Sequence, residues 1–213
     1  MYNSISTHFH YESIIQKSRF IVDIFPINSE EEAKLLLQEI RKKYYDATHH
    51  CSAYRLYPEA LREHSSDDGE PAGTAGKPML NVLQHRDLVQ VLAIVTRYFG
   101  GIKLGTGGLV RAYGGTLSEA LDAALAEHLL VRHSPHALFQ LTIPYDLLGV
   151  MENDWQDRPY IIQERTFSEA VTITIAIPEN EAVTFSTRVT ELSAARIQIE
   201  SLGITSIASP IKP

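Results

Sequence analysis

Four segments in the first half of the chain show the hydrophobic patterns of β-strands. Residues 9–15 and 18–25 predict two strands joined by a short turn, and residues 49–57 alternate as a third. Residues 88–95 are nearly all apolar, which indicates a central strand covered on both faces. This half therefore contains a sheet with at least one fully buried strand.

Three other segments of this half have the spacing of helices that bury one face. Ser29 and Glu32 form a capping box, which predicts a helix with its apolar face at Ala33, Leu36, Leu37, Ile40 and Tyr44. Residues 77–84 predict a short helix. A long helix follows with Thr106 as its expected N-cap, and its buried stripe comprises Leu109, Ala112, Tyr113, Thr116, Leu117, Ala120, Leu121, Ala124 and Leu125. Residues 58–76 are predicted to be a long loop. Strands covered by helices make a two-layer α/β domain.

The second half has a different order of elements. The pattern predicts strand, helix, strand, strand, helix and strand over residues 138–143, 147–155, 160–167, 170–177, 181–192 and 197–204. This is the β-α-β-β-α-β order of a ferredoxin-like sandwich. The helical pattern of the first half stops at Arg132–His136, which is the predicted boundary. We therefore expect an α+β chain with domains at residues 1–134 and 137–213.

Composition narrows the class of protein. The chain has 213 residues, of which 44% are hydrophobic, and it has no apolar run long enough to span a bilayer. Its first residues lack the basic and apolar parts of a signal peptide. A single cysteine, Cys51, excludes an internal disulfide. These features favour a cytoplasmic protein without a membrane partner.

Charge is segregated along the chain. The net charge of −7 argues against a protein that wraps duplex DNA, which needs a broad positive surface. Residues 77–111 are the exception, since one acid, Asp87, stands there against five cations: Lys77, Arg86, Arg97, Lys103 and Arg111. A local positive patch of this kind steers an anionic partner.

The segment 97–111 concentrates the features of an anion site. It holds five glycines, three cations and no carboxylate between a predicted buried strand and the long helix. Unpaired amides at a helix N-terminus bind phosphate, and glycine allows close approach. The predicted contacts to phosphate or nucleic acid are Arg97, Lys103, Thr106, Gly107, Gly108, Arg111 and Lys77. The alternative is that the glycines only make tight turns and that the cations are solvated.

Two known nucleotide motifs do not fit this segment. Gly100 and Gly105 have the spacing of the P-loop glycines, but Thr106 stands where that motif needs lysine. A dinucleotide fingerprint starting at Gly105 needs a third glycine at the position of Val110.

The loop at residues 66–78 carries a second group of polar residues. Asp67, Asp68 and Glu70 follow His64, and such oxygen-rich clusters hold Mg²⁺ or supply an acid or base. More often they are solvated or cap helices. We expect them to form an acidic wall opposite the cations. We predict no catalytic residue, metal or cofactor, because no second carboxylate cluster with metal spacing occurs.

His49, His50 and Cys51 form the third group. On a strand, His49 and Cys51 share a face, which supplies only two ligands where zinc needs at least three. A nucleophilic Cys51 beside a histidine is one interpretation, and a small buried thiol is the favoured one.

Three long motifs resemble the YigZ/IMPACT family. They are Lys17-Ser-Arg-Phe-Ile21, the loop from Ser66-Asp-Asp-Gly-Glu-Pro to Gly-Thr-Ala-Gly-Lys-Pro78, and Arg97-Tyr-Phe-Gly-Gly-Ile-Lys-Leu-Gly-Thr-Gly-Gly-Leu-Val-Arg-Ala-Tyr113. The similarity covers most of residues 1–130, and the second half is similar to the small C-terminal domain of bacterial members.

This resemblance implies a fold and a field of activity. The N-terminal domain should be a two-layer sandwich like the second domain of small-subunit ribosomal protein five, and the C-terminal domain should be ferredoxin-like. Eukaryotic relatives regulate translation by opposing activation of the kinase that senses uncharged tRNA. Some members are labelled peptidases, but no peptidase metal site or nucleophile triad is present in this sequence.

Three functions follow from these features. The first is a non-enzymatic protein that binds RNA or the ribosome in translational control, with a protein partner as a further expectation. The second is an enzyme acting on a small phosphorylated ligand or nucleotide through the glycine-rich and acidic loops. The third is a protein-interaction module whose second domain offers a sheet edge or helices.

Overall fold

The structure, a computed structural model, describes residues 1–57 and 61–212. It divides into two compact units. The first unit comprises Tyr2–Arg132 and Ala208–Pro213, and the second comprises His133–Ile207 together with Met1. The two-domain α+β architecture with antiparallel sheets is thereby confirmed.

The first unit is built on a five-stranded sheet. Its order is β2 (Phe9–Ile15), β3 (Ser18–Pro26), β6 (Val91–Tyr98), β4 (His49–Leu56) and β5 (Arg62–Ser66), and every neighbouring pair is antiparallel. β6 is central and is buried along nearly its whole length, as expected, although it begins three residues later than predicted. A further strand, β1 (Tyr2–Ile5), which the sequence pattern did not predict, pairs with β7 (Leu130–Ile143).

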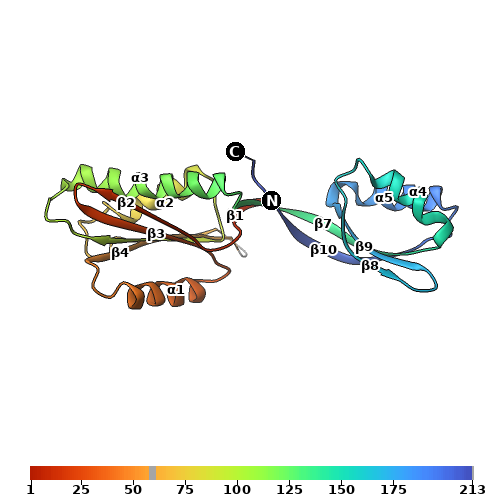
Figure 1. Cartoon of the computed structure of the whole chain (residues 1–213), viewed down its shortest axis with the longest axis horizontal. Coiled ribbons are helices and arrows are strands. Elements are labelled where there is room, and N and C mark those ends of the chain that lie inside the picture. The colour runs from red at the N-terminus through yellow and green to blue at the C-terminus, as the bar shows by residue number, and fades with distance from the viewer. Residues whose placement is uncertain (58–60, 213) are drawn as a thin grey trace. The chain divides into compact units, whose positions relative to one another are not determined.

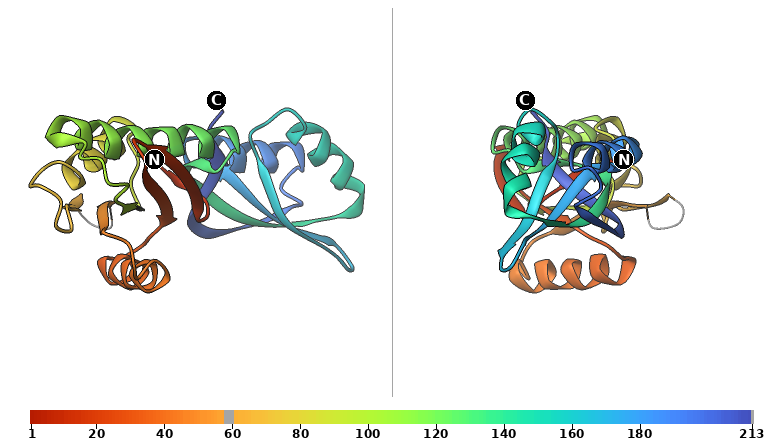
Figure 2. Two further views of the ribbon diagram at one scale, coloured as in Figure 1. Left: turned by 60° about the vertical axis from the view of Figure 1, so that its left-hand side comes forward. Right: turned by 90° about the vertical axis from the view of Figure 1, so that its right-hand side faces the viewer.

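Helices cover both faces of this sheet. α2 (Gly76–His85) and α3 (Gly105–Ala126) lie on one face and α1 (Glu30–Lys43) on the other (Figure 1). A large core lies under α2 and α3, and a smaller one lies under α1 around Ile27, Ile40 and Ile94. The unit therefore has a third layer beyond the two that the sequence pattern predicted. The two views in Figure 2 show α1 apart from α3 on the far side of the sheet.

The predicted cap of α1 forms at Ser29, while the reciprocal bond of the capping box goes to the residue before it. Ser29 is the N-cap, and its hydroxyl accepts a hydrogen bond from the amide of Glu32 at 3.1 Å. The carboxylate of Glu32 in turn accepts from the amide of Asn28 at 2.7 Å. Two amides at the helix start are satisfied locally.

The predicted loop over residues 58–76 is wrong in part, because it contains β5. This strand has no apolar side chain, so its pattern did not indicate a strand. It is held by pairing with β4 and by polar contacts, including the Arg55–Glu63 ion pair at 2.8 Å and the stacked rings of Tyr54 and His64. Residues 58–60 of the predicted loop lie outside the described residues.

The second unit has the ferredoxin-like order. β7 is followed by α4 (Tyr145–Trp155), β8 (Ile161–Phe167), β9 (Val171–Pro178), α5 (Ala182–Leu192) and β10 (Gln198–Pro210), with a 3₁₀ turn at Glu179–Glu181. The strand order across the sheet is β10-β7-β9-β8, in which β7 and β8 both run antiparallel to β9. One face of the sheet carries α4 and α5 (Figure 1).

The predicted boundary at Arg132–His136 does not fall in a loop. β7 runs unbroken through these residues, so the change from helical to strand pattern marked the beginning of a long strand. The chain also returns to the first unit at its end, where the amide of Ile211 donates to the carbonyl of Leu130 at 2.8 Å. The expected domains at 1–134 and 137–213 differ from the observed division at this C-terminal segment.

Candidate anion-binding site

Arg97 is not available to an external anion, which corrects the prediction for this residue. Its side chain is 6% exposed, and its guanidinium donates to the Glu70 carboxylate at 2.6 Å and to the Ser18 hydroxyl at 3.2 Å. Arg97 shares its face of β6 with the core residues Val91, Ala93 and Val95, because alternate side chains of a strand point the same way. Its charge is neutralised inside the protein.

The partner of Arg97, Glu70, was predicted to belong to an acidic wall opposite the cations, and it does face one of them, but the pair is buried. The Glu70 side chain is 4% exposed and accepts a second hydrogen bond from the Tyr113 hydroxyl at 2.8 Å. Burial, followed by the neighbouring Cys51 and Glu70, raises the pKa of Tyr113, so its hydroxyl stays protonated and donates. Ser18, Glu70, Arg97 and Tyr113 come from all three of the long sequence motifs and meet in one buried network.

Asp67 fills the N-terminus of α2. Its carboxylate accepts from the amides of Gly73 at 2.8 Å and of Ala75 and Gly76 at 2.9 Å each. Burial raises the pKa of Asp67, but the three backbone hydrogen bonds outweigh it, so the net pKa is lowered. The chain's own carboxylate thus occupies the anion position of this helix.

Asp68 is also used internally. Its carboxylate accepts from the amide of His50 at 2.6 Å and from the Arg41 guanidinium at 2.5 Å. With Asp67 on α2 and Glu70 buried, the three acids of the predicted wall each hold the fold together. Among residues 1–57 and 61–212, no three His, Cys, Asp or Glu side chains are grouped so as to hold a metal ion.

Cys51 is a buried structural thiol. It has no exposed surface, and its Sγ donates to the carbonyl of Asp67 at 3.0 Å. Burial, only partly offset by a hydrogen bond with Tyr113, raises the pKa of Cys51 to about 12, so the thiol is protonated at neutral pH. This environment fits the interpretation of Cys51 as a small buried thiol better than that of a nucleophile.

The start of α3 differs from the starts of α1 and α2. The N-cap is Leu104 rather than the predicted Thr106, and no side chain caps the helix. Gly105 begins the helix at φ +70°, a conformation that a β-branched residue such as threonine avoids. Because the helix begins at Gly105, Thr106 lies one residue inside it, and Gly107 and Gly108 follow.

The cation nearest this turn is Arg111. A Cβ placed on Gly107 would lie 3.7 Å from a terminal nitrogen of Arg111, so the guanidinium folds back over the first turn. Thr106, Gly107 and Arg111 are exposed, and so is Lys103, which directly precedes the N-cap. Amides without a side-chain cap and a guanidinium thus face solvent together, as an anion site requires.

Lys77 lies at the start of α2, which packs beside the middle of α3 and not beside its first turn. A Cβ on Gly114 would contact Pro78, and the guanidinium of Arg86 donates to Ser118 further along α3. These contacts show that α2 and α3 run parallel, so both N-termini point the same way. Lys77 is exposed, but its neighbour Pro78 packs near Gly114, so Lys77 is separate from the first turn of α3. The exposed cations of the predicted set at that turn are Lys103 and Arg111, and we call these two residues with the first turn of α3 the α3 turn site.

The fold places this chain among two-domain α+β proteins, in which a unit with a five-stranded antiparallel sheet is joined to a ferredoxin-like unit. Comparison of the sequence with known protein families identifies the family. Residues 16–121 match the Impact N-terminal domain, and residues 141–196 match a domain of unknown function, DUF1949. The chain belongs to the IMPACT family.

Its bacterial relatives are similar over most of their length. IMPACT family member YvyE of Bacillus subtilis is 40% identical over 92% of this chain and 88% of the relative. IMPACT family member YigZ of Escherichia coli is 36% identical over 87% of this chain and 90% of the relative. Protein IMPACT-A of Xenopus tropicalis is 39% identical over 45% of this chain and 31% of that protein.

Two solved structures are similar to this chain. A crystal structure described as that of a hypothetical protein is 33% identical, covers 94% of this chain and 97% of its own, and has a TM-score of 0.58. A structure of the two-domain translational regulator Yih1 is 28% identical over 57% of this chain and 46% of its own, with a TM-score of 0.36. In the part of this chain that the structure describes, no helix is long and apolar enough to cross a membrane.

Proposed function

We propose that this protein is a non-enzymatic, cytoplasmic RNA- or ribosome-binding protein that acts in the regulation of translation, and that the α3 turn site contacts phosphate groups. The observation that carries the proposal is the first turn of α3. It has exposed glycine, no side-chain cap and the guanidinium of Arg111 folded over it. Phosphate groups are the ligands that such turns accept.

The setting in translation comes from the family. The resemblance of the three long motifs implies eukaryotic relatives that regulate translation, and these motifs lie in the unit that holds the α3 turn site. The same unit contains the match to the Impact N-terminal domain. The partner class that we infer is therefore RNA in the translation machinery, with phosphate contacts supplying most of the affinity.

Catalysis on a phosphorylated ligand is the less favoured function. Its candidate bases and Mg²⁺ ligands were Asp67, Asp68 and Glu70, and each of these carboxylates is engaged by amides, arginine or tyrosine of the protein itself. A free carboxylate beside the α3 turn would be needed, and no observation on the described residues supplies one.

The test compares two charge-matched double variants of the full chain. Lys103→Glu with Arg111→Glu reverses the α3 turn site, whereas Lys34→Glu with Lys42→Glu reverses two exposed cations of α1 on the opposite face of the sheet. Binding to single-stranded RNA and co-sedimentation with ribosomes are followed across a salt series.

We expect the α3 pair to lose binding and the α1 pair to retain it. Each phosphate contact on a single strand contributes about 0.7 to the slope of log K against log salt, so the α3 pair should lower that slope by about 1.4. Equal binding by the two double variants, or no binding by the unaltered protein, would refute the proposal.

A further inference from the structure

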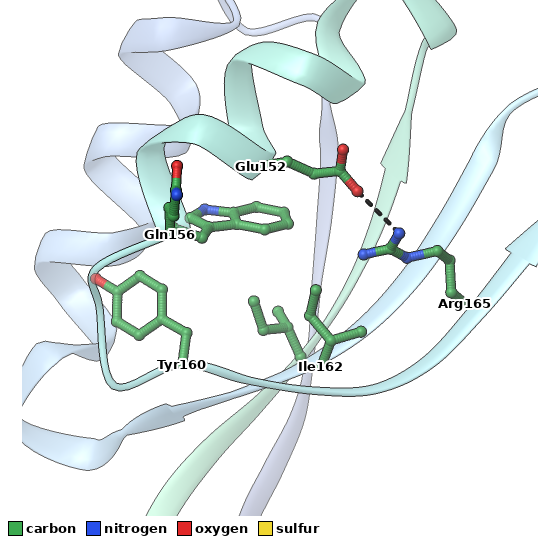
Figure 3. Close-up of a pocket in the computed structure, with 7 residues that line it drawn as sticks. Glu152, Gln156, Tyr160, Ile162 and Arg165 are labelled. Atoms are coloured by element: carbon green, nitrogen blue, oxygen red, sulfur yellow. Dashed lines mark ion pairs between the residues drawn. The ribbon is translucent and has the colours of Figure 1, made fainter.

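The second unit contains a pocket between α4 and the edge strand β8 (Figure 3). It has a volume of about 210 Å³, and it is lined by aromatic and aliphatic side chains with a polar rim. Trp155 and Tyr160, which form two walls of the pocket, both pack on the core residue Phe185. Their ring centroids lie 6.2 Å and 5.3 Å from that of Phe185, so the core fixes their positions. A cavity of about 150 Å³ already accommodates a benzene ring, so this pocket has room for one aromatic or branched aliphatic side chain.

The polar rim of the pocket is an ion pair. Glu152 of α4 and Arg165 of β8 approach to 2.8 Å, and both side chains are more than one-third exposed. Figure 3 shows them on one side of the pocket, with Tyr160 and Gln156 on the other. The indole Nε1 of Trp155 is buried and has no hydrogen-bond partner among the described residues, so the wall also carries an unsatisfied donor.

β8 is an open sheet edge beside this pocket. It is the last strand of its sheet, its residues are exposed throughout, and among the described residues no strand pairs with its outer side. Ile162 lines the pocket, and Phe167 is 59% exposed. Both residues pair with core residues of β9, so their side chains lie on the face of the sheet that the helices cover. Apolar side chains and unpaired backbone groups are thus exposed side by side, as in sheets that accept an added strand.

The charge of this unit decides between a peptide and a nucleic acid. Residues 133–207 hold four arginines and no lysine against ten aspartates and glutamates, a net charge of −6. Such a surface repels phosphate backbones and attracts cationic segments. The remaining residues of the chain have a net charge of only −1.

We propose that the second unit binds an extended, cationic peptide segment that adds a strand to β8 and places one aromatic or branched aliphatic side chain in the pocket beside Trp155. Backbone hydrogen bonds to the edge strand supply affinity, and the pocket selects the anchoring side chain. Glu152 and the other acids of the unit favour lysine and arginine around that anchor.

The chain has a built-in reporter for this site. Trp155 is the only tryptophan in the sequence, so the tryptophan emission of the full-length protein, excited selectively over its ten tyrosines, comes from the pocket wall alone. The probes are synthetic heptapeptides that alternate lysine and threonine around a central phenylalanine, tyrosine or leucine. Matched probes replace the anchor with alanine, replace lysine with glutamate, or carry N-methyl groups on alternate amides.

We expect saturable changes in Trp155 emission with the lysine peptides at a Kd below about 1 mM. Loss of the anchor or N-methylation should weaken binding about tenfold or more, and the glutamate peptide should not bind. Ile162→Glu should abolish binding, whereas Ile161→Glu should retain it. Ile161 and Ile162 are both 38% exposed but point to opposite faces of the sheet, so the two variants are matched.

Several results would overturn this proposal. Absence of binding by every lysine peptide would do so, as would equal binding by the two isoleucine variants. Unweakened binding of the N-methylated peptide would remove the added strand from the proposal. Saturable binding of single-stranded RNA that Ile162→Glu abolishes would assign the pocket to a nucleic acid. A dimer in sedimentation that the same variant dissociates would assign it to a second copy of the chain.

Discussion

The buried pair of Arg97 and Glu70 gives a sharp prediction for stability. Substituting Glu70→Gln preserves the shape of the side chain and removes its charge. The guanidinium of Arg97, with its side chain 6% exposed, then has no carboxylate at 2.6 Å to balance it. Its Nε already lacks a hydrogen-bond partner among the described residues. The Ser18 hydroxyl and the rings of Phe20 and Phe99 remain beside the guanidinium, but none of these groups carries a negative charge.

The expected cost is about 3–5 kcal/mol of unfolding free energy, because removal of one partner leaves a buried charge uncompensated. A domain of this kind has about 5–15 kcal/mol in total, so the variant should be close to unfolding at moderate temperature. Tyr113→Phe should cost less, about 1.5–3 kcal/mol, because it removes one hydrogen bond to a charged acceptor and leaves the ion pair intact.

Urea unfolding followed by far-UV circular dichroism measures these changes. Emission of Trp155, recorded in the same samples, reports on the second unit. The matched control is Glu12→Gln, which removes the carboxylate from an ion pair with Arg19 that is about as short, 2.7 Å, but 40–48% exposed. Exposed pairs contribute less than about 1 kcal/mol.

The double variant Glu70→Gln with Arg97→Met separates the charge effect from packing. If the uncompensated guanidinium is the cause, the double variant should be less destabilised than the sum of the two single ones. Additive losses, or a cost for Glu70→Gln no larger than that of the exposed control, would refute the reasoning.

Three further predictions concern single positions. Because Cys51 is buried with its pKa raised to about 12, native protein at pH 8 should not react with a disulfide reagent, and urea-unfolded protein should react at once. Asp67→Ala should cost about 0.5–2 kcal/mol at neutral pH. Since the folded-state pKa of Asp67 is lowered, this difference should be full above about pH 4 and disappear as the pH falls through the folded-state value, as acid titration of stability will measure. Gly100→Ala should prevent folding, because its Cβ would lie 2.0 Å from the backbone of Lys17, whereas Gly115→Ala, with open space on α3, should raise the melting temperature.

Most of the fold could be predicted because its signals are local. The capping box at Ser29, the apolar run of β6 and the alternation of β9 each fix an element through its own residues. β5 could not be predicted in this way, since its five residues are polar or charged and its strand conformation depends on pairing with β4. The C-terminal return to the first unit likewise depends on a partner far away in sequence.

The candidate site was predicted less well, because charged residues that are close in the sequence were assumed to have side chains that are close in space. Arg97 stands six residues before Lys103, but its place on β6 turns it into the core. The alternation of Val91, Ala93 and Val95 contained that signal. The roles of Ser18 and Tyr113 could not be inferred locally, since their partners are 79 and 43 residues away.

Comparison of the three helix starts in the first unit supports a functional role for α3. Ser29 caps α1 with its hydroxyl, and Asp67 closes α2 with a carboxylate. At α3 the chain has Leu104 where either device would stabilise the fold by about 0.5–2 kcal/mol. A helix start without a side-chain cap beside Lys103 and Arg111 is the arrangement that an anionic partner can use.

The second unit carries nearly all of the net negative charge. An RNA bound at the first unit and a cationic segment bound at β8 would therefore use different charged groups of the protein. The salt dependence of RNA binding should then be unchanged by Ile162→Glu, and the affinity for cationic peptides should be unchanged when Lys103 and Arg111 are reversed.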